Sequence, residues 1–247
     1  TPSSRVALVS RSQGLEHRNY QRLLDDDAAG LTRKAWYRRW WYPTARLSQV
    51  AMAARLADRM IVLNAGDAAF VNAHGWKRPD AIDIIPHGVS ARFLDSAPPP
   101  DALRGRGILF CGTWEDVKGV RYLAAAFSDV AAAVPEARLT IVGAAMPEEI
   151  VLSHFAPHPR AAVTVLQRVS EEDVMRQYLV QDLLVLPSTY EGFGMVVVEA
   201  MSQRLPVVST PVGCAPSLIR HGETGLLAMR RSPQDLAAPL SRVLADP

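Results

Sequence analysis

The sequence predicts an α/β protein with a parallel sheet that is covered by helices on both faces. Two observations support this fold class. From residue 107 onward, short runs rich in Val, Leu and Ile alternate with longer segments of helical pattern. The short runs are apolar throughout instead of at every second position, which is typical of strands buried on both faces. The C-terminal part of the chain is therefore expected to form an α/β domain.

In this C-terminal part, each expected strand is a short apolar run, and most of these runs are followed by a helical segment. The expected strands are 107–112, 138–143, 162–167, 182–188, 206–210 and 225–228. The expected helices are 118–134, 147–155, 170–179, 194–203 and 232–244.

The first part of the chain has a less regular pattern. Pro43 is expected to kink or end a long helical region, and Gly75 to end a short helix. The expected strands are 5–10, 59–66 and 81–90, with a turn at 12–20, an interruption at 25–30, a helical region at 32–60 and a short helix at 67–76.

A proline-rich segment predicts where the two parts are joined. Residues 96–107 read SAPPPDALRGRG, and three consecutive prolines are incompatible with a helix interior or a central strand. We therefore predict a partial N-terminal domain at 1–95, a linker at 96–106 and a C-terminal domain at 107–247.

Composition narrows the classes of function. Apolar residues make up 49% of the chain, which suffices for a core, yet no apolar run reaches the roughly 18 residues of a membrane span. The net charge is only +2, and although the first 60 residues are basic, no nucleic-acid partner is predicted. Cys111 and Cys214 are far apart, and no Cys/His cluster has the spacing of metal ligands. We expect two free thiols in a reducing cytoplasm, and neither a metal nor a cofactor.

The stretch PSTYEGFGMVVVEAM, residues 187–201, predicts a binding site. A buried strand ends here, and a helix begins near Gly194. Ligands of open α/β sheets lie at the carboxyl ends of strands, where a helix N-terminus offers unpaired N–H groups to an anion. Residues 192–196 could therefore bind a phosphate. Glu199, inside the helix, could accept hydrogen bonds from a ribose diol; the alternative is a solvent-facing helix glutamate.

Lys118 points to the same edge of the sheet. It lies in the turn between the strand 107–112 and the helix after it, where its ammonium could neutralise a diphosphate. The alternative is an ordinary surface lysine. No G-x-G-x-x-G follows this strand and no P-loop motif occurs in the chain, so a dinucleotide-binding fold and a P-loop ATPase both lose support.

Together these stretches resemble the retaining nucleotide-sugar glycosyltransferases of the GT-B fold, the group 1 or family 4 set. Glu191 and Glu199 match the E-x7-E signature of that family. The stretch CGTWEDVKG at 111–119 approximates its Gly-Arg-Leu…Lys-Gly element. Three further stretches are similar to family segments: 204–228, IIPHGVSARFL at 84–94 and SRSQGLEH at 10–17.

The resemblance implies a GT-B architecture, with a Rossmann-like C-terminal domain and an incomplete Rossmann-like N-terminal domain. It implies a retaining, metal-independent transfer from a nucleoside diphosphate sugar to a glycan, lipid-linked or small-molecule acceptor. The implied catalytic residues are Glu191 and Lys118, and the implied acceptor-side residues are Gln13 and Glu16. The residues implied to bind the donor are Glu199, Gly192, Phe193, Gly194, Met195, Val196, Thr113 and Val169.

Four positions depart from the family pattern. Thr113 replaces a phosphate-binding Arg, and Gln13 replaces a His near the donor sugar. Ser217 and His87 stand where Glu and Asn are common. The resemblance also implies that this chain is a piece of a longer enzyme, because residues 1–95 are too few for a complete acceptor-side domain.

Other interpretations remain open from the sequence. The chain could be a non-catalytic nucleotide-sugar binding module or an inactive fragment, because Gln13 and Thr113 depart from the family pattern. A GT-B epimerase or phosphorylase is another alternative. The phosphorylase would need a lysine that holds pyridoxal phosphate, and Lys34 and Lys77 lie outside the C-terminal domain. Residues 33–46, RKAWYRRWWYPTAR, mix Arg and Lys with Trp and could contact the inner face of a membrane peripherally. Their alternative is an ordinary helix whose aromatic side chains pack inward.

Overall fold

A computed structural model describes residues 6–31, 40–95, 107–167 and 169–245. The chain divides into two compact units. The first contains the residues up to His87 together with Tyr190–Phe193, and the second contains Gly88–Thr189 and the residues from Gly194 onward. The predicted linker at 96–106 lies outside the described residues, as does the part of the Trp-rich stretch that precedes Trp40.

The first unit is built on a sheet of three parallel strands in the order β1-β2-β3. Its strands are β1 (Val9–Arg11), β2 (Arg59–Val62) and β3 (Ile82–Ile84). Its helices are α1 (Glu16–Ala28), the π-helix η1 (Tyr42–Leu47), α3 (Ser48–Leu56), α4 (Ala65–Ala73) and the short 3-10 helix η2 (Pro79–Ala81). Its core contains Leu15, Ala51, Ala54, Met60, Val62, Val71 and Trp76. The predicted irregularity at Pro43 coincides with the first turn of the π-helix.

The prediction of a turn at 12–20 and an interruption at 25–30 was wrong, because α1 covers most of both segments. A polar i,i+4 ion pair supports this helix. Arg22 and Asp26 are both buried and lie 2.5 Å apart, and Arg22 also donates to Asn19. The actual turn is confined to the residues around Gly14, whose φ is 144°. The sequence did not predict this helix because Asp25–Asp27 lie in its last turn, where carboxylates are unfavourable.

The second unit contains six parallel strands in the order β6-β5-β4-β7-β8-β9. The strands are β4 (Gly107–Cys111), β5 (Arg138–Val142), β6 (Val163–Leu166), β7 (Leu183–Leu186), β8 (Val207–Ser209) and β9 (Gly225–Leu227). The chain starts in the middle at β4, winds outward to β6, and returns to the other side of β4 at β7. This is the doubly wound order of a Rossmann-like domain, so the predicted α/β parallel sheet is confirmed.

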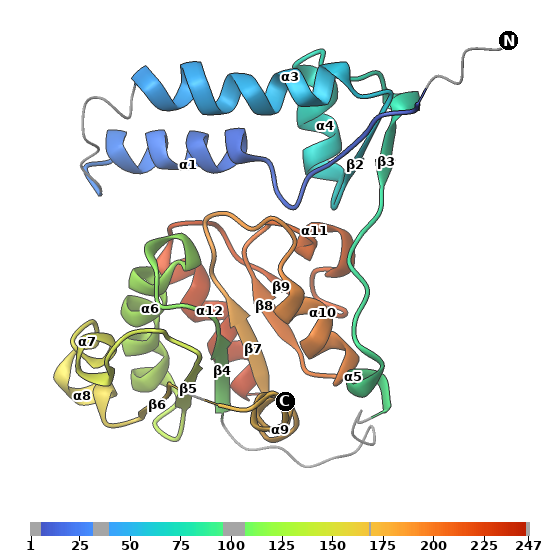
Figure 1. The fold of residues 1–247 in the computed structure, drawn as a ribbon. Coiled ribbons are helices and arrows are strands. Elements are labelled where there is room, and N and C mark those ends of the chain that lie inside the picture. Colours follow the sequence, from blue (N-terminus) through green and yellow to red (C-terminus); the bar gives the residue numbers. More distant parts are fainter. Residues whose placement is uncertain (1–5, 32–39, 96–106, 168, 246–247) are drawn as a thin grey trace, which may run out of the picture. The chain divides into compact units, whose positions relative to one another are not determined.

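Helices precede, connect and follow these strands (Figure 1). They are α5 (Ala91–Asp95), the 3-10 helix η3 (Asp116–Lys118), α6 (Val120–Ala133), α7 (Glu148–Leu152), α8 (Pro157–Arg160), α9 (Glu171–Val180), α10 (Met195–Ser202), α11 (Ala215–Leu218) and α12 (Pro233–Ala245). The sequence did not predict α5, α8 and α11, which are too short for a helical period to be visible.

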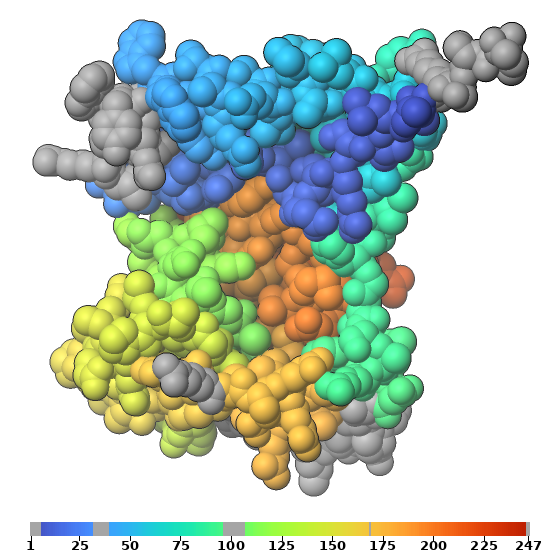
Figure 2. Space-filling view, in the orientation of Figure 1, coloured from blue at the N-terminus to red at the C-terminus, as the bar shows by residue number. Residues whose placement is uncertain are grey.

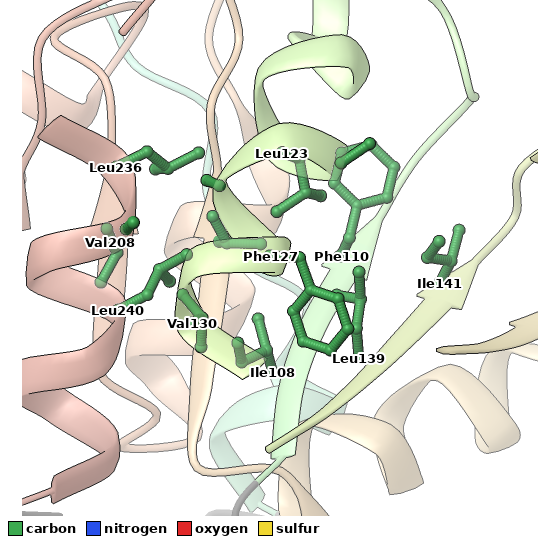
Figure 3. Packing of buried hydrophobic residues seen from close by; sticks show 14 of the residues in the cluster. Ile108, Phe110, Leu123, Phe127, Val130, Leu139, Ile141, Val208, Leu236 and Leu240 are labelled. Atoms are coloured by element: carbon green, nitrogen blue, oxygen red, sulfur yellow. The ribbon is translucent and has the colours of Figure 1, made fainter. Parts of the chain in front are cut away.

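The core of the second unit lies where α6 and α12 pack on one face of the sheet (Figure 3). Phe127 of α6 and Leu240 of α12 are fully buried there. Leu183 and Val185 of β7 belong to this cluster, whereas Leu186 contacts Gly194 at the start of α10. Because side chains alternate along a strand, α10 therefore covers the opposite face. Burial on both faces explains why these strands are apolar at every position.

No helix among the described residues combines the length and the apolar character that crossing a bilayer requires. Figure 2 shows the segments that follow β4 and β5 in green and yellow.

Candidate functional site

The site lies at the point where the winding of the second sheet reverses direction. Strands β4 and β7 are direct neighbours, with Ile108 opposite Leu183 and Leu109 opposite Leu184. The chain leaves β4 toward β5 and leaves β7 toward β8, so the loops that follow β4 and β7 diverge. Such a reversal opens a crevice at the carboxyl ends of the strands, which is where open α/β sheets bind ligands.

The loop after β4 is fastened to the end of β7. The backbone N–H and the hydroxyl of Thr189 both donate to the carbonyl oxygen of Val117, at 2.8 and 3.2 Å. Gly119 has φ 73° and lies so close to Pro187 that a Cβ atom there would overlap the Pro187 carbonyl oxygen. Only glycine therefore fits at position 119 without displacing the backbone. These contacts fix the position of Lys118, which lies between Val117 and Gly119.

Lys118 extends back toward the end of β4. Its side chain is half-buried, and its Cε atom lies 3.9 Å from the position that a Cβ on Gly112 would occupy. Burial raises the pKa of the neighbouring Cys111 thiol to about 11, and the positive charge of Lys118 partly opposes that rise. The Lys118 ammonium therefore exerts its charge at the carboxyl end of β4, where Cys111 lies.

Glu199 lies at the same edge and is half-buried in α10. Its Oε2 atom accepts a hydrogen bond of 2.8 Å from the hydroxyl of Tyr178, a fully buried residue of α9. Burial raises the pKa of the Glu199 carboxyl, and the Tyr178 hydrogen bond partly opposes this shift. The charges of Glu199 and Lys118 both act on the pKa of Cys111 at the end of β4, and we refer to these three residues and Tyr178 as the cluster.

The N-terminus of α10 is a second position in the site at which an anion could bind. The helix begins after Gly194, whose φ is 91°, and no side chain of the described residues caps it. Uncapped N–H groups and the positive end of the helix dipole favour a negative charge at this position. The thiol of Cys214 donates to the Gly194 carbonyl oxygen at 3.5 Å. The predicted donor residues Met195 and Val196 form the half-buried first turn of this helix.

The other predicted donor-binding residues and the predicted catalytic residue Glu191 are placed as follows. Thr113 is half-buried in the loop after β4, and Val169 is half-buried between β6 and α9. Glu191, Gly192 and Phe193 belong to the first unit. There, the Asn64 side-chain amide donates to the Gly192 carbonyl oxygen at 2.9 Å.

The predicted acceptor-side residues are in the first unit. Gln13 is exposed in the loop after β1. Glu16, in the first turn of α1, accepts three hydrogen bonds of 2.7 to 3.1 Å from Arg46, and the Tyr42 hydroxyl donates to it at 3.4 Å. The Glu16 carboxylate is therefore already engaged by an arginine.

The family is identified by its sequence profile. The profile of the glycosyl transferases group 1 family matches residues 105–246, more than half of the chain. The chain belongs to the group 1 glycosyltransferases. The matched segment is the one that contains Lys118, Tyr178 and Glu199.

Curated relatives of this group 1 glycosyltransferase are longer than the chain. One is D-inositol 3-phosphate glycosyltransferase from Segniliparus rotundus, 28% identical over 220 residues that make up 83% of this chain and 48% of that protein. Another is the enzyme of the same name from Mycobacterium sp. (strain KMS), 32% identical over 206 residues, or 76% of this chain and 45% of that protein. The chain spans about half the length of the curated relatives it matches.

Solved structures confirm the fold expected for this family. Sucrose-phosphate synthase from Thermosynechococcus elongatus superimposes with a TM-score of 0.75 at 24% identity, over 96% of this chain and 58% of that protein. Anabaena Alr3699/HepE in complex with UDP and glucose superimposes with a TM-score of 0.67 at 20% identity, over 97% of this chain and 62% of that protein.

Sequence reasoning about this glycosyltransferase missed Tyr178, Cys111 and Gly119 as parts of the cluster. Tyr178 is 21 residues from its partner Glu199, and nothing in the stretch around it indicates that its hydroxyl meets a carboxylate. Gly119 carried a signal, since a glycine beside a lysine in a strand-to-helix turn often marks a close backbone approach. Among the described residues, no three His, Cys, Asp or Glu side chains are grouped so that they could hold a metal ion.

Proposed function

We propose that the chain is part of a retaining glycosyltransferase that transfers a sugar from a nucleoside diphosphate sugar to a glycan, lipid-linked or small-molecule acceptor. The observation that carries the proposal is the placement of Lys118, Glu199 and the uncapped start of α10 at one reversal point of the second sheet. These groups provide one cation, one hydroxyl acceptor and a set of backbone donors. A nucleoside diphosphate presents the complementary groups.

In this proposal, the diphosphate lies against the first turn of α10, at Gly194 to Val196, with the Lys118 ammonium beside it. When the bond to the sugar breaks, negative charge builds up on the outer phosphate. The helix amides and Lys118 stabilise that charge without a metal ion, because their dipoles and charge are held in place before the reaction begins. Thr113, in the loop after β4 and five residues before Lys118, offers a hydroxyl.

The nucleoside would be held by Glu199 and the loop after β6. The Glu199 carboxylate accepts hydrogen bonds from the ribose hydroxyls, and the backbone of Val169 pairs with the edge of the base. Glu191 binds hydroxyls of the transferred sugar, in a loop with Gly192 and Phe193. The acceptor would be bound by the first unit near Gln13 and Glu16.

The relatives support a sugar nucleotide as the donor. The Anabaena protein was crystallised with UDP and glucose, and two curated relatives are named D-inositol 3-phosphate glycosyltransferases. A non-catalytic nucleotide-sugar binding module is the alternative. Gln13 favours it because Gln cannot act as an acid or a base in place of the family's His. Thr113 favours it because Thr carries no charge to replace the family's phosphate-binding Arg. Sugar transfer by the longer natural protein, with and without Glu199→Ala, distinguishes the two.

A thermal-shift experiment tests the proposed function on this chain. UDP, GDP and ADP are added separately, and one of them is expected to raise the melting temperature by about 5 to 10 °C at a hundredfold excess over its Kd. Glu199→Ala is expected to remove most of that shift, whereas the control Glu223→Ala, on an exposed pair with Arg220, retains it. If none of the three nucleotides stabilises the parent chain, the proposal is wrong.

A second proposal concerns a cytoplasmic membrane surface. Trp40 and Trp41 are 76% and 63% exposed, and Arg46 follows five residues after Trp41. Exposed tryptophans beside basic residues favour the interface of an anionic bilayer, at the inner face of the membrane.

For this proposal we expect co-sedimentation with vesicles of mixed phosphatidylcholine and phosphatidylserine at low salt. Replacing Trp40 and Trp41 by Ala should reduce the bound fraction several-fold, because each indole contributes buried apolar area. Replacing the exposed Met52 by Ala is the control. Equal binding of all three proteins, or no binding at low salt, would contradict a membrane role for this surface.

A further inference from the structure

We propose that Tyr178 is a positioning residue for Glu199, and that it thereby determines how strongly the site prefers a ribose with both hydroxyls. This inference rests on the proposed function, because it assigns the ribose to Glu199. Tyr178 would act through the carboxylate and would not touch the nucleotide itself.

The packing around Tyr178 fixes its ring. The side chain is fully buried in α9, and its ring meets that of Phe93 edge to face, with centroids 5.8 Å apart and an interplanar angle of 74°. Phe93 is itself buried in α5, where the side-chain amide of Gln203 donates to its carbonyl oxygen. The phenolic oxygen is fixed to the ring, so this packing also fixes the position of the oxygen that faces Glu199.

The hydrogen bond then orients the carboxylate. A glutamate has three rotatable side-chain bonds, and ordering it on binding would weaken the nucleotide affinity. The 2.8 Å bond from the Tyr178 hydroxyl occupies one lone pair of Oε2 and leaves Oε1 available as an acceptor. The carboxylate is thus held in a single orientation before the ribose arrives, as a preorganised acceptor.

This arrangement should discriminate strongly between a ribose and a ribose analogue that lacks its hydroxyls. A site built around a fixed acceptor loses much affinity for an analogue that lacks the matching hydroxyl, since the desolvated carboxylate is then left unpaired. A mobile carboxylate could turn to water instead. Tyr178 is therefore expected to matter for a ribonucleotide and hardly at all for a dideoxyribonucleotide.

The experiment compares Tyr178→Phe with the parent chain by calorimetric titration of UDP, GDP and ADP and of their 2′,3′-dideoxy forms. For the nucleotide that binds the parent, we expect Tyr178→Phe to raise the Kd about tenfold and to leave the Kd of the dideoxy form unchanged. Tyr20→Phe, in α1 of the first unit, makes the same chemical change elsewhere and should alter neither Kd. Melting curves confirm that each variant is folded.

A double variant tests whether Tyr178 acts through the carboxylate. Once Glu199→Gln is present, adding Tyr178→Phe should cause no further loss of ribonucleotide affinity. Additive losses, or equal weakening of the ribo and dideoxy forms, would overturn the positioning role while leaving the proposed function intact. If no nucleoside diphosphate binds the parent chain, the proposed function and this inference both fail.

The pH dependence of binding is an independent readout. Besides Tyr178, Glu171 at the start of α9 acts on the Glu199 carboxyl. Glu199 in turn acts on Cys111 at the end of β4, which is also affected by the charge of Lys118 in η3. The Tyr178 hydrogen bond lowers the pKa of the Glu199 carboxyl against the effect of burial. Removal of this hydrogen bond raises the pKa of Glu199, so the carboxylate becomes protonated at a higher pH. As the pH is lowered, ribonucleotide affinity should therefore begin to fall at a higher pH in Tyr178→Phe than in the parent. Identical pH profiles would contradict the inference.

Discussion

Lys118→Met is expected to raise the Kd for the bound nucleoside diphosphate about 30- to 100-fold. The reason is electrostatic. A charge-assisted contact in a partly buried site contributes about 2 to 3 kcal/mol, and each 1.4 kcal/mol corresponds to a factor of ten. Because the ammonium would face the diphosphate and not the nucleoside, the Kd of the free nucleoside should stay unchanged. Calorimetric titration of the diphosphate and the nucleoside measures both.

Two matched variants accompany this measurement. Lys77→Met removes the same charge in the first unit, where the ammonium donates to the Arg55 carbonyl oxygen, and should not affect nucleotide binding. Lys118→Arg retains the charge and should recover part of the affinity. An equal loss for the diphosphate and the nucleoside would mean that Lys118 supports the fold of the loop instead of neutralising phosphate.

Gly119→Ala is expected to lower the free energy of unfolding by about 3 kcal/mol or more. A left-handed backbone costs an alanine about 1 to 2 kcal/mol, and the new Cβ would also overlap the Pro187 carbonyl oxygen. Relief of that overlap would separate the loop after β4 from the end of β7, where Thr189 now holds Val117. Urea unfolding measures the loss of stability.

Gly143→Ala is the matched control for that experiment. Gly143 has nearly the same φ, 75°, but no atom lies within 4 Å of the position of its Cβ. It should therefore show the conformational cost alone, about 1 to 2 kcal/mol. If the two variants are equally stable, the close approach of Gly119 to Pro187 does not constrain the loop.

The elements of the second unit could be predicted because their signals are local. A run such as Leu183–Leu186 is apolar at every position, and only a strand with helices on both faces buries all of its side chains. Lys118 and Glu199 could be proposed as neighbours for a related reason. Each lies just beyond or beside the carboxyl end of a strand, and the carboxyl ends of parallel strands meet at one edge of the sheet.

The features that the sequence did not reveal depend on pairs far apart in the chain. Thr189 and Val117 are 72 residues apart, and neither residue type indicates a partner. Tyr178 looks like an ordinary core aromatic of an amphipathic helix until the fold brings its hydroxyl to Glu199. Helix α1 was missed for another reason, since its buried side carries an Arg22–Asp26 pair, whereas an amphipathic helix is recognised by apolar residues on that side.

Hydrogen exchange of the full chain, with and without the stabilising nucleotide, tests the central claim most directly. If the reversal point of the second sheet binds a nucleoside diphosphate, exchange should slow at the backbone amides of 112–119 and 194–199. The account is contradicted if these segments are unaffected, or if protection is confined to the hollow at the opposite edge of the sheet, which is lined by Arg204, Glu223 and Arg242.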